Sequence, residues 1–120
     1  MNDAQPALHH AGVTIDASGI AEITIRHSGR LNLLGTPVIT DLRLAFERLA
    51  CDAGVRTVVL RGTGDAAFVA GADIKEMGRL DPGSARGFID GLRRLCEAVR
   101  HCPVPVIARL PGWALGGGLE

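Results

Sequence analysis

The chain has 120 residues, a length that suits one small domain or part of a larger one. Hydrophobic residues make up 47% of the chain and charged residues 22%, and this balance excludes an intrinsically disordered protein. The 13 basic and 13 acidic residues give a formal net charge of zero, so composition indicates neither a nucleic-acid partner nor a membrane surface as a partner.

The first predicted elements are a tail and a β-hairpin. Residues 1–12 are expected to form a flexible tail. Apolar and polar residues alternate over 13–16 and again over 20–25, and Ala17-Ser18-Gly19 lies between the two runs. Alternation with period two on both sides of a turn is typical of two paired strands.

A helix and a strand are predicted next. Thr36 offers a capping hydroxyl and Pro37 suits the first helical position, so the helix is expected to begin there. Apolar residues recur at three- and four-residue steps from Val38 to Ala50, which predicts one buried face, and Ala53-Gly54 ends the helix. The β-branched run at residues 56–61 predicts a buried strand.

The last part of the chain predicts two further strands around a second helix. A short strand is expected at 68–70, and a helix from 82–84 to the Cys102-Pro103 pair. Residues 104–108 predict another buried strand, and 111–113 a turn. Strands alternating with helices favour an α/β fold, and the repeated strand-strand-helix order favours a stacked superhelix over one simple sheet.

The three cysteines have neither disulfide nor metal-ligand spacing. Cys51 and Cys96 lie on apolar helical positions and are predicted to be small core residues in a reducing compartment. Residues 1–10 resemble neither a signal nor a transit peptide, and no apolar run approaches the ~20 residues of a membrane-spanning helix. These features predict a soluble, cytoplasmic protein. His9, His10 and His27 have no partners at useful spacing and are expected to be solvated.

Two glycine segments carry the chemical information. In the first, a short strand ends at Ala70, Gly71 permits unusual dihedrals, and Ala72 has almost no side chain, so the N–H of Ala72 can face a cleft. The alternative is an ordinary strand-to-helix turn. Asp73 and Glu76 resemble an acid/base pair, but negative charge at a helix start explains them better.

The second segment is Gly116-Gly117-Gly118, followed by Leu119 and Glu120. Glycine costs roughly 1 kcal/mol against alanine inside a helix, so such a run persists where backbone approaches backbone or a ligand. At a helix start it presents unpaired N–H groups to negative charge. Helix-on-sheet packing is the alternative, and the spacing matches neither a P-loop nor a dinucleotide fingerprint.

Four stretches carry a more specific signal: 30–34 (RLNLL), 68–77 (FVAGADIKEM), 105–108 (PVIA) and 112–120 (GWALGGGLE). Taken together, these stretches are similar to the enoyl-CoA hydratase/isomerase (crotonase) superfamily. The similarity covers the chain from about Val13 onward and implies a crotonase-like superhelix of β-β-α units, truncated, with residues 13–120 as its N-terminal part.

The resemblance implies an oxyanion hole and an acyl-CoA substrate. The backbone N–H groups of Ala72 and Gly117 correspond to the two donors that hold the thioester oxygen, and Glu120 to one of two catalytic glutamates. No metal and no cofactor are implied, since coenzyme A is part of the substrate. Lys75 is a candidate near the CoA phosphates, with a solvated helix residue as the alternative. The implied CoA-binding residues are Leu33, Ala70, Gly71, Asp73, Ile74, Lys75 and Gly116.

The chain also departs from the family. His27 stands where a proline is common and Leu33 where an alanine is common. Family domains are about twice as long, and the second catalytic glutamate belongs to a later segment. Because Glu120 corresponds to a catalytic glutamate, we expect an enoyl-CoA hydratase that forms homotrimers or dimers of trimers at full length. A double-bond isomerase or another acyl-CoA enzyme of the family is the alternative. A hypothesis outside enzyme function is that the chain is a non-catalytic truncated fragment or a piece that mediates oligomer interactions.

Overall fold

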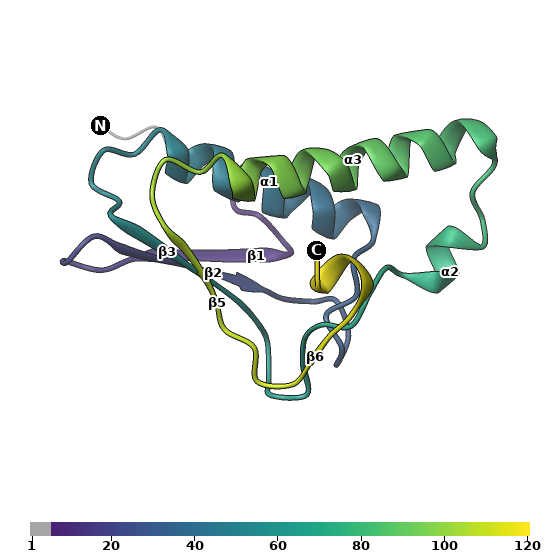
Figure 1. Cartoon of the computed structure of the whole chain (residues 1–120), viewed down its shortest axis with the longest axis horizontal. Helices are drawn as coiled ribbons and strands as arrows, with labels where there is room; N and C mark the ends of the chain where they lie inside the picture. The colour runs from purple at the N-terminus through teal and green to yellow at the C-terminus, as the bar shows by residue number, and fades with distance from the viewer. Residues whose placement is uncertain (1–5) are drawn as a thin grey trace.

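The computed structural model describes residues 6–120 as two long helices over a four-stranded sheet, with a two-stranded sheet at one end (Figure 1). Residues 1–5 of the predicted tail lie outside the described part. The rest of that tail differs from the prediction, because Leu8 is buried in the hydrophobic core and the first strand begins at Ala11. The packed structure therefore starts before residue 13.

The larger sheet contains the predicted hairpin. Strands β1 (Ala11–Ile15) and β2 (Ile20–Ile25) pair antiparallel, and β3 (Thr57–Gly62) and β5 (Val106–Ala108) continue the sheet in parallel, in the order β1-β2-β3-β5. Alternate residues of β2 and β3 are buried, because successive side chains of a strand point to opposite faces. The buried set is Ala21, Ile23, Ile25, Val58 and Leu60.

Helix α1 (Thr36–Ala50) buries the predicted apolar face, but its start differs from the prediction. The cap is Gly35, without a side-chain hydrogen bond, and Thr36 is already the first helical residue. The Thr36 N–H donates to Oε1 of Glu76 at 2.9 Å, and the Thr36 hydroxyl donates to the other oxygen of the same carboxylate. A carboxylate distant in sequence thus satisfies the helix start. The buried residues of α1 are Val38, Ile39, Leu42, Ala45, Phe46 and Leu49.

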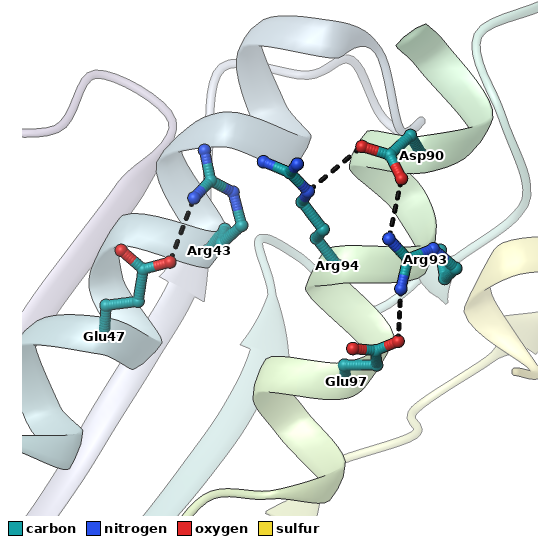
Figure 2. A network of polar contacts seen from close by, with 6 residues as sticks. All are labelled: Arg43, Glu47, Asp90, Arg93, Arg94 and Glu97. Atoms are coloured by element: carbon teal, nitrogen blue, oxygen red, sulfur yellow. Dashed lines mark hydrogen bonds and ion pairs between the residues drawn. The ribbon is translucent and has the colours of Figure 1, made fainter. Parts of the chain in front are cut away.

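Helix α3 (Pro82–Arg100) packs against α1 and carries a charged outer face. Its start is a capping box, in which the Asp81 carboxylate accepts from the Ser84 N–H at 2.7 Å. Further along, Arg93 bridges Asp90 and Glu97 (Figure 2). The hydrogen bond from Arg93 lowers the pKa of the Asp90 carboxyl. Such exposed pairs stabilise a protein weakly, so this network marks a solvent-facing surface rather than a site.

The smaller sheet was only half predicted. Strand β4 (Ala67–Val69) is the expected short strand, and it pairs in parallel with β6 (Trp113–Ala114), a segment predicted to be a turn. The prediction of a buried strand at 104–108 is also wrong in part. β5 is short and lies at the sheet edge, and Ile107 is 55% exposed.

One side-chain prediction is wrong and another is incomplete. Cys51 is exposed rather than buried, because α1 ends at Ala50 and Cys51 follows as its C-terminal cap. His9 and His27 are exposed as expected, yet their rings stack on each other with centroids 4.4 Å apart. No helix within residues 6–120 has the length and apolar character needed to cross a membrane.

Candidate active site

The parallel pairing of β4 with β6 brings the two glycine segments side by side. Because parallel strands end at the same edge of a sheet, the residues after Val69 and after Ala114 meet there. The Leu115 N–H donates to the Val69 carbonyl at 3.0 Å. A Cβ on Gly116 would lie 3.7 Å from the Cα of Gly71, so the two backbones are in contact. About 45 residues separate these segments in sequence.

The first segment presents the N–H of Ala72. Ala72 forms a parallel bridge with Leu34, in which the Leu34 N–H donates to the Gly71 carbonyl and the Asp73 N–H donates to the Leu34 carbonyl, each at 2.9 Å. In a parallel bridge the middle residue directs its own N–H away from the partner strand. No residue of the described chain accepts a hydrogen bond from the Ala72 N–H. That N–H is therefore available to an acceptor.

The second segment presents the N–H of Gly117. Residues Gly116–Gly118 form a single 3₁₀ turn, η1, in which Gly116 has a φ of 54°. The carbonyl of Leu115 accepts from Gly118, and the carbonyl of Gly116 accepts from Leu119 and Glu120. The Gly117 N–H has no acceptor within residues 6–120, as is usual for N–H groups at a helix start.

Glu120 follows one turn later and contributes to the lining of an apolar pocket. Its backbone N–H donates to the Gly116 carbonyl at 3.1 Å, and its residue is exposed. The pocket has a volume of about 320 Å³ and is bounded by the sheet, α1, α3 and η1. Its walls include Ile25, Leu34, Leu42, Leu60, Phe68, Leu92, Leu95, Cys96, Val99, Val106, Gly117 and Glu120.

Cys96 lines this pocket as an unreactive thiol. Burial, and then the negative charge of Glu120, raise the pKa of its thiol, so the thiol stays protonated near neutral pH. Within the described residues, no group of three or more His, Cys, Asp or Glu side chains has the geometry to hold a metal ion.

Apart from Gly116, which lies in η1, the residues predicted to bind coenzyme A lie on two touching loops. The first loop contains Leu33, and the second runs from Ala70 to Asp73 and continues into the first residues, Ile74 and Lys75, of helix α2 (Ile74–Met77). Besides the Leu34–Ala72 bridge, the Ala70 N–H donates to the Leu31 carbonyl at 3.1 Å. Lys75 is exposed, which suits either a phosphate contact or a solvated residue. Ile74 is 78% exposed, and Gly116 is exposed beside Gly71.

The two carboxylates near this loop have separate roles. Asp73 caps helix α2 (Ile74–Met77), where its Oδ1 accepts from the Lys75 N–H at 3.0 Å and the Glu76 N–H at 3.4 Å. This confirms that Asp73 provides helix-start charge. Glu76 instead contacts the start of α1 through Thr36. The two side chains therefore do not act as an acid/base pair.

Two further residues shape the site: sequence reasoning included Gly118 in the glycine run, but it gave no role to Asn32. A Cβ on Gly118 would lie 2.1 Å from the Val69 carbonyl oxygen, so only glycine fits between η1 and β4. Asn32 is completely buried in the loop before α1. A polar residue within the otherwise apolar stretch 31–34 was the available signal for Asn32.

The comparisons identify the class of protein that this fold and site define. Residues 16–120 match the family model described as enoyl-CoA hydratase/isomerase, and the chain therefore belongs to that family, the crotonase superfamily. A structure titled enoyl-CoA hydratase/carnithine racemase from Magnetospirillum magneticum superposes with a TM-score of 0.87 at 35% identity, covering 94% of this chain and 43% of that one. The structure of DspI from Pseudomonas aeruginosa superposes with a TM-score of 0.88 at 29% identity, and the match covers 99% of this chain and 45% of that one.

Two curated relatives show how much of a family member the chain represents. It is 35% identical to enoyl-CoA hydratase domain-containing protein 2 of Mus musculus, over 96% of the chain and 39% of that protein. It is 35% identical to human methylglutaconyl-CoA hydratase, over 85% of the chain and 30% of that protein. The chain thus spans well under half of either relative. Both names include "mitochondrial", so a cytoplasmic location for this chain stays a prediction.

Proposed function

We propose that this chain supplies the oxyanion hole and one catalytic glutamate of an enoyl-CoA hydratase. The reaction is syn-type addition of water to a 2-enoyl-CoA thioester, giving a 3-hydroxyacyl-CoA, as in the degradation of fatty acids or related acyl-CoA compounds. The observation that carries the proposal is the pair of N–H groups, on Ala72 and Gly117, that have no acceptor among residues 6–120 and lie on adjoining backbone segments.

The proposed chemistry follows from where charge develops. Water adds a hydroxyl at C3 and a proton at C2, and the intermediate enolate places its negative charge on the thioester oxygen. The N–H groups of Ala72 and Gly117 donate to that oxygen, and removing one such donor typically costs about 10²–10³ in kcat. Glu120 moves a proton as acid or base beside C2 and C3. The resemblance assigns the second glutamate to a later segment of the family domain.

Substrate binding is proposed to use the two touching loops. The adenine end of coenzyme A lies against Leu33 and residues 70–75, with Lys75 near the phosphates. The acyl chain is proposed to enter the apolar pocket that Glu120 helps to line. At full length the protein is proposed to assemble as a homotrimer or a dimer of trimers.

The test is turnover of crotonyl-CoA by the protein expressed from the complete reading frame. The matched pair of variants is Glu120→Gln and Glu47→Gln, since Glu47 pairs with Arg43 on the outer surface of α1 (Figure 2). We expect Glu120→Gln to lower kcat by at least about 100-fold and Glu47→Gln to leave it unchanged. The proposal fails if the wild-type protein does not hydrate crotonyl-CoA, or if Glu120→Gln hydrates it equally well.

A double-bond isomerase is the second candidate, because this reaction needs only one well-placed carboxylate and Glu120 can supply it. One carboxylate suffices to remove a proton from C2 of a 3-enoyl-CoA and return it at C4. Turnover of a 3-enoyl-CoA to the 2-enoyl isomer, without hydration of the product, would select this reaction.

A non-catalytic role for the isolated 120-residue chain is a third candidate. Large apolar side chains are exposed near its C-terminus, with Trp113 at 62% and Leu119 at 76%. Exposed apolar surface of this kind promotes association. We expect the isolated chain to aggregate and to lack hydratase turnover, as measured by size-exclusion chromatography and the crotonyl-CoA assay. A monodisperse, active 120-mer would contradict this expectation.

A further inference from the structure

Asn32 is the one polar or charged residue among 6–120 that is buried, with 0% of its surface exposed. It lies in the loop between β2 and α1, in the left-handed region with a φ of 52°. Its Nδ2 donates to the carbonyl oxygens of Ala67 at 3.0 Å and Thr63 at 3.2 Å. These two carbonyls flank the turn that joins β3 to β4. One side-chain amide therefore holds that turn against the loop.

The surroundings of this amide fit asparagine closely. A Cβ on Gly62 would lie 2.2 Å from Nδ2 of Asn32, so the amide occupies space that only a glycine leaves free. Carbonyl oxygens only accept hydrogen bonds, so the NH₂ group of the amide must face them, and this fixes the orientation of the amide. Its Oδ1 is buried and accepts no hydrogen bond from the described residues. An unpaired buried acceptor is unfavourable, so the asparagine is held here by the two hydrogen bonds that its Nδ2 donates.

The hydrogen bonds on either side of Asn32 lead to the candidate oxyanion donor. The Leu31 carbonyl accepts from the Ala70 N–H, and the Leu34 bridge fixes the peptide groups on both sides of Ala72. Asn32 lies between Leu31 and Leu34. A shift of this loop would therefore turn the Ala72 N–H away from its direction in the structure.

We propose that Asn32 is a positioning residue for the Ala72 N–H. Its amide locks the loop at residues 31–34 to the β3–β4 turn, and the loop in turn sets the direction in which Ala72 donates. Asn32 touches neither substrate nor reacting atoms. The catalytic consequence rests on the proposed function, whereas the positioning itself does not.

The first test measures amide hydrogen exchange by NMR in the protein from the complete reading frame. Asn32→Asp keeps the shape of the side chain and replaces the NH₂ group by an oxygen that faces two carbonyls. We expect the Leu34, Ala70 and Asp73 amides to exchange at least about 10-fold faster, with α1 amides unchanged. Asn32→Gly, which tolerates the positive φ, should have the same effect if Asn32→Asp does not fold.

A matched control separates positioning from general destabilisation. Leu49→Ala removes a buried side chain at the far end of α1 and should lower stability without selective exchange at Leu34, Ala70 and Asp73. Unchanged exchange of those three amides in both Asn32 variants would overturn the proposal. So would an equal acceleration of the three amides in Leu49→Ala.

The second test is kinetic. Displacing an oxyanion donor predicts that Asn32→Asp lowers kcat for crotonyl-CoA by about 10- to 100-fold, with KM within about threefold. The carbonyl stretch of a bound thioester should also move toward its frequency in solution, because the thioester oxygen loses a donor. If wild-type protein shows no turnover, the proposed function fails and the exchange test still decides the role of Asn32. Full kcat in a folded Asn32→Asp protein would overturn the positioning role.

Discussion

Replacing Gly118 by alanine adds one methyl group, yet it should lower both the stability of the fold and the activity of the candidate site. The added methyl group would lie 2.1 Å from the Val69 carbonyl oxygen and 2.8 Å from the Val69 Cβ. Ordinary contacts begin near 3.4 Å, so η1 must move from β4 by about 1 Å. The same carbonyl accepts from Leu115, and that hydrogen bond must stretch as well. Overpacking of this kind costs about 1–3 kcal/mol of stability.

The catalytic effect should exceed the stability effect, because Gly117 is the neighbouring residue. A displacement of about 1 Å at a catalytic group can cost about 100-fold in rate. The assay is crotonyl-CoA hydration alongside denaturant unfolding of the same variant. The control is Gly87→Ala on the exposed side of α3, where the added Cβ meets nothing within 4 Å. That variant should gain up to about 1 kcal/mol and keep full activity. Wild-type kcat in folded Gly118→Ala would refute the reasoning.

Three other substitutions test separate contacts. Glu76→Ala removes the acceptor at the start of α1 and should lower the unfolding free energy by about 1 kcal/mol in denaturant titrations; an unchanged midpoint would contradict the cap. Lost hydration, followed by the charges of His9, Arg26 and His10, lowers the pKa of the His27 imidazole. The folded state therefore binds fewer protons than the unfolded state, and the free energy of unfolding should fall as the pH drops below about 6.5. His27→Asn, which tolerates the φ of 57°, should flatten that fall, and an identical pH dependence would exclude His27 as its source. Lys75→Ala should raise KM for the CoA thioester several-fold with kcat within about twofold; an unchanged KM would assign Lys75 to solvent.

Sequence alone predicted the elements whose signals are local. The hairpin around Gly19, the apolar face of α1 and the end of α3 before Pro103 follow from turn chemistry, helical periodicity and the steric effect of proline. The two glycine segments were also found from sequence, because glycine destabilises regular structure and marks places where the backbone adopts unusual dihedrals or approaches another group closely.

The remaining features depend on partners distant in the chain. Thr36 has every local mark of a helix cap, yet Gly35 holds that position and Glu76 satisfies the helix start from forty residues away. Strand β6 has two residues and forms because β4 lies beside it. Local propensity carries no information about such pairings, so they appear only when the chain is folded.

The same dependence explains why the candidate site contains so few functional side chains. Ala72 and Gly117 offer only backbone N–H groups, and a backbone donor is aimed by the pairing of its strand rather than by a rotamer. Aiming Ala72 needs the Leu34 bridge, and aiming Gly117 needs the close approach of Gly118 to Val69. Each of these contacts joins segments more than thirty residues apart. Substitutions that alter catalysis should therefore concentrate at packing positions such as Gly62, which chemical motifs do not mark.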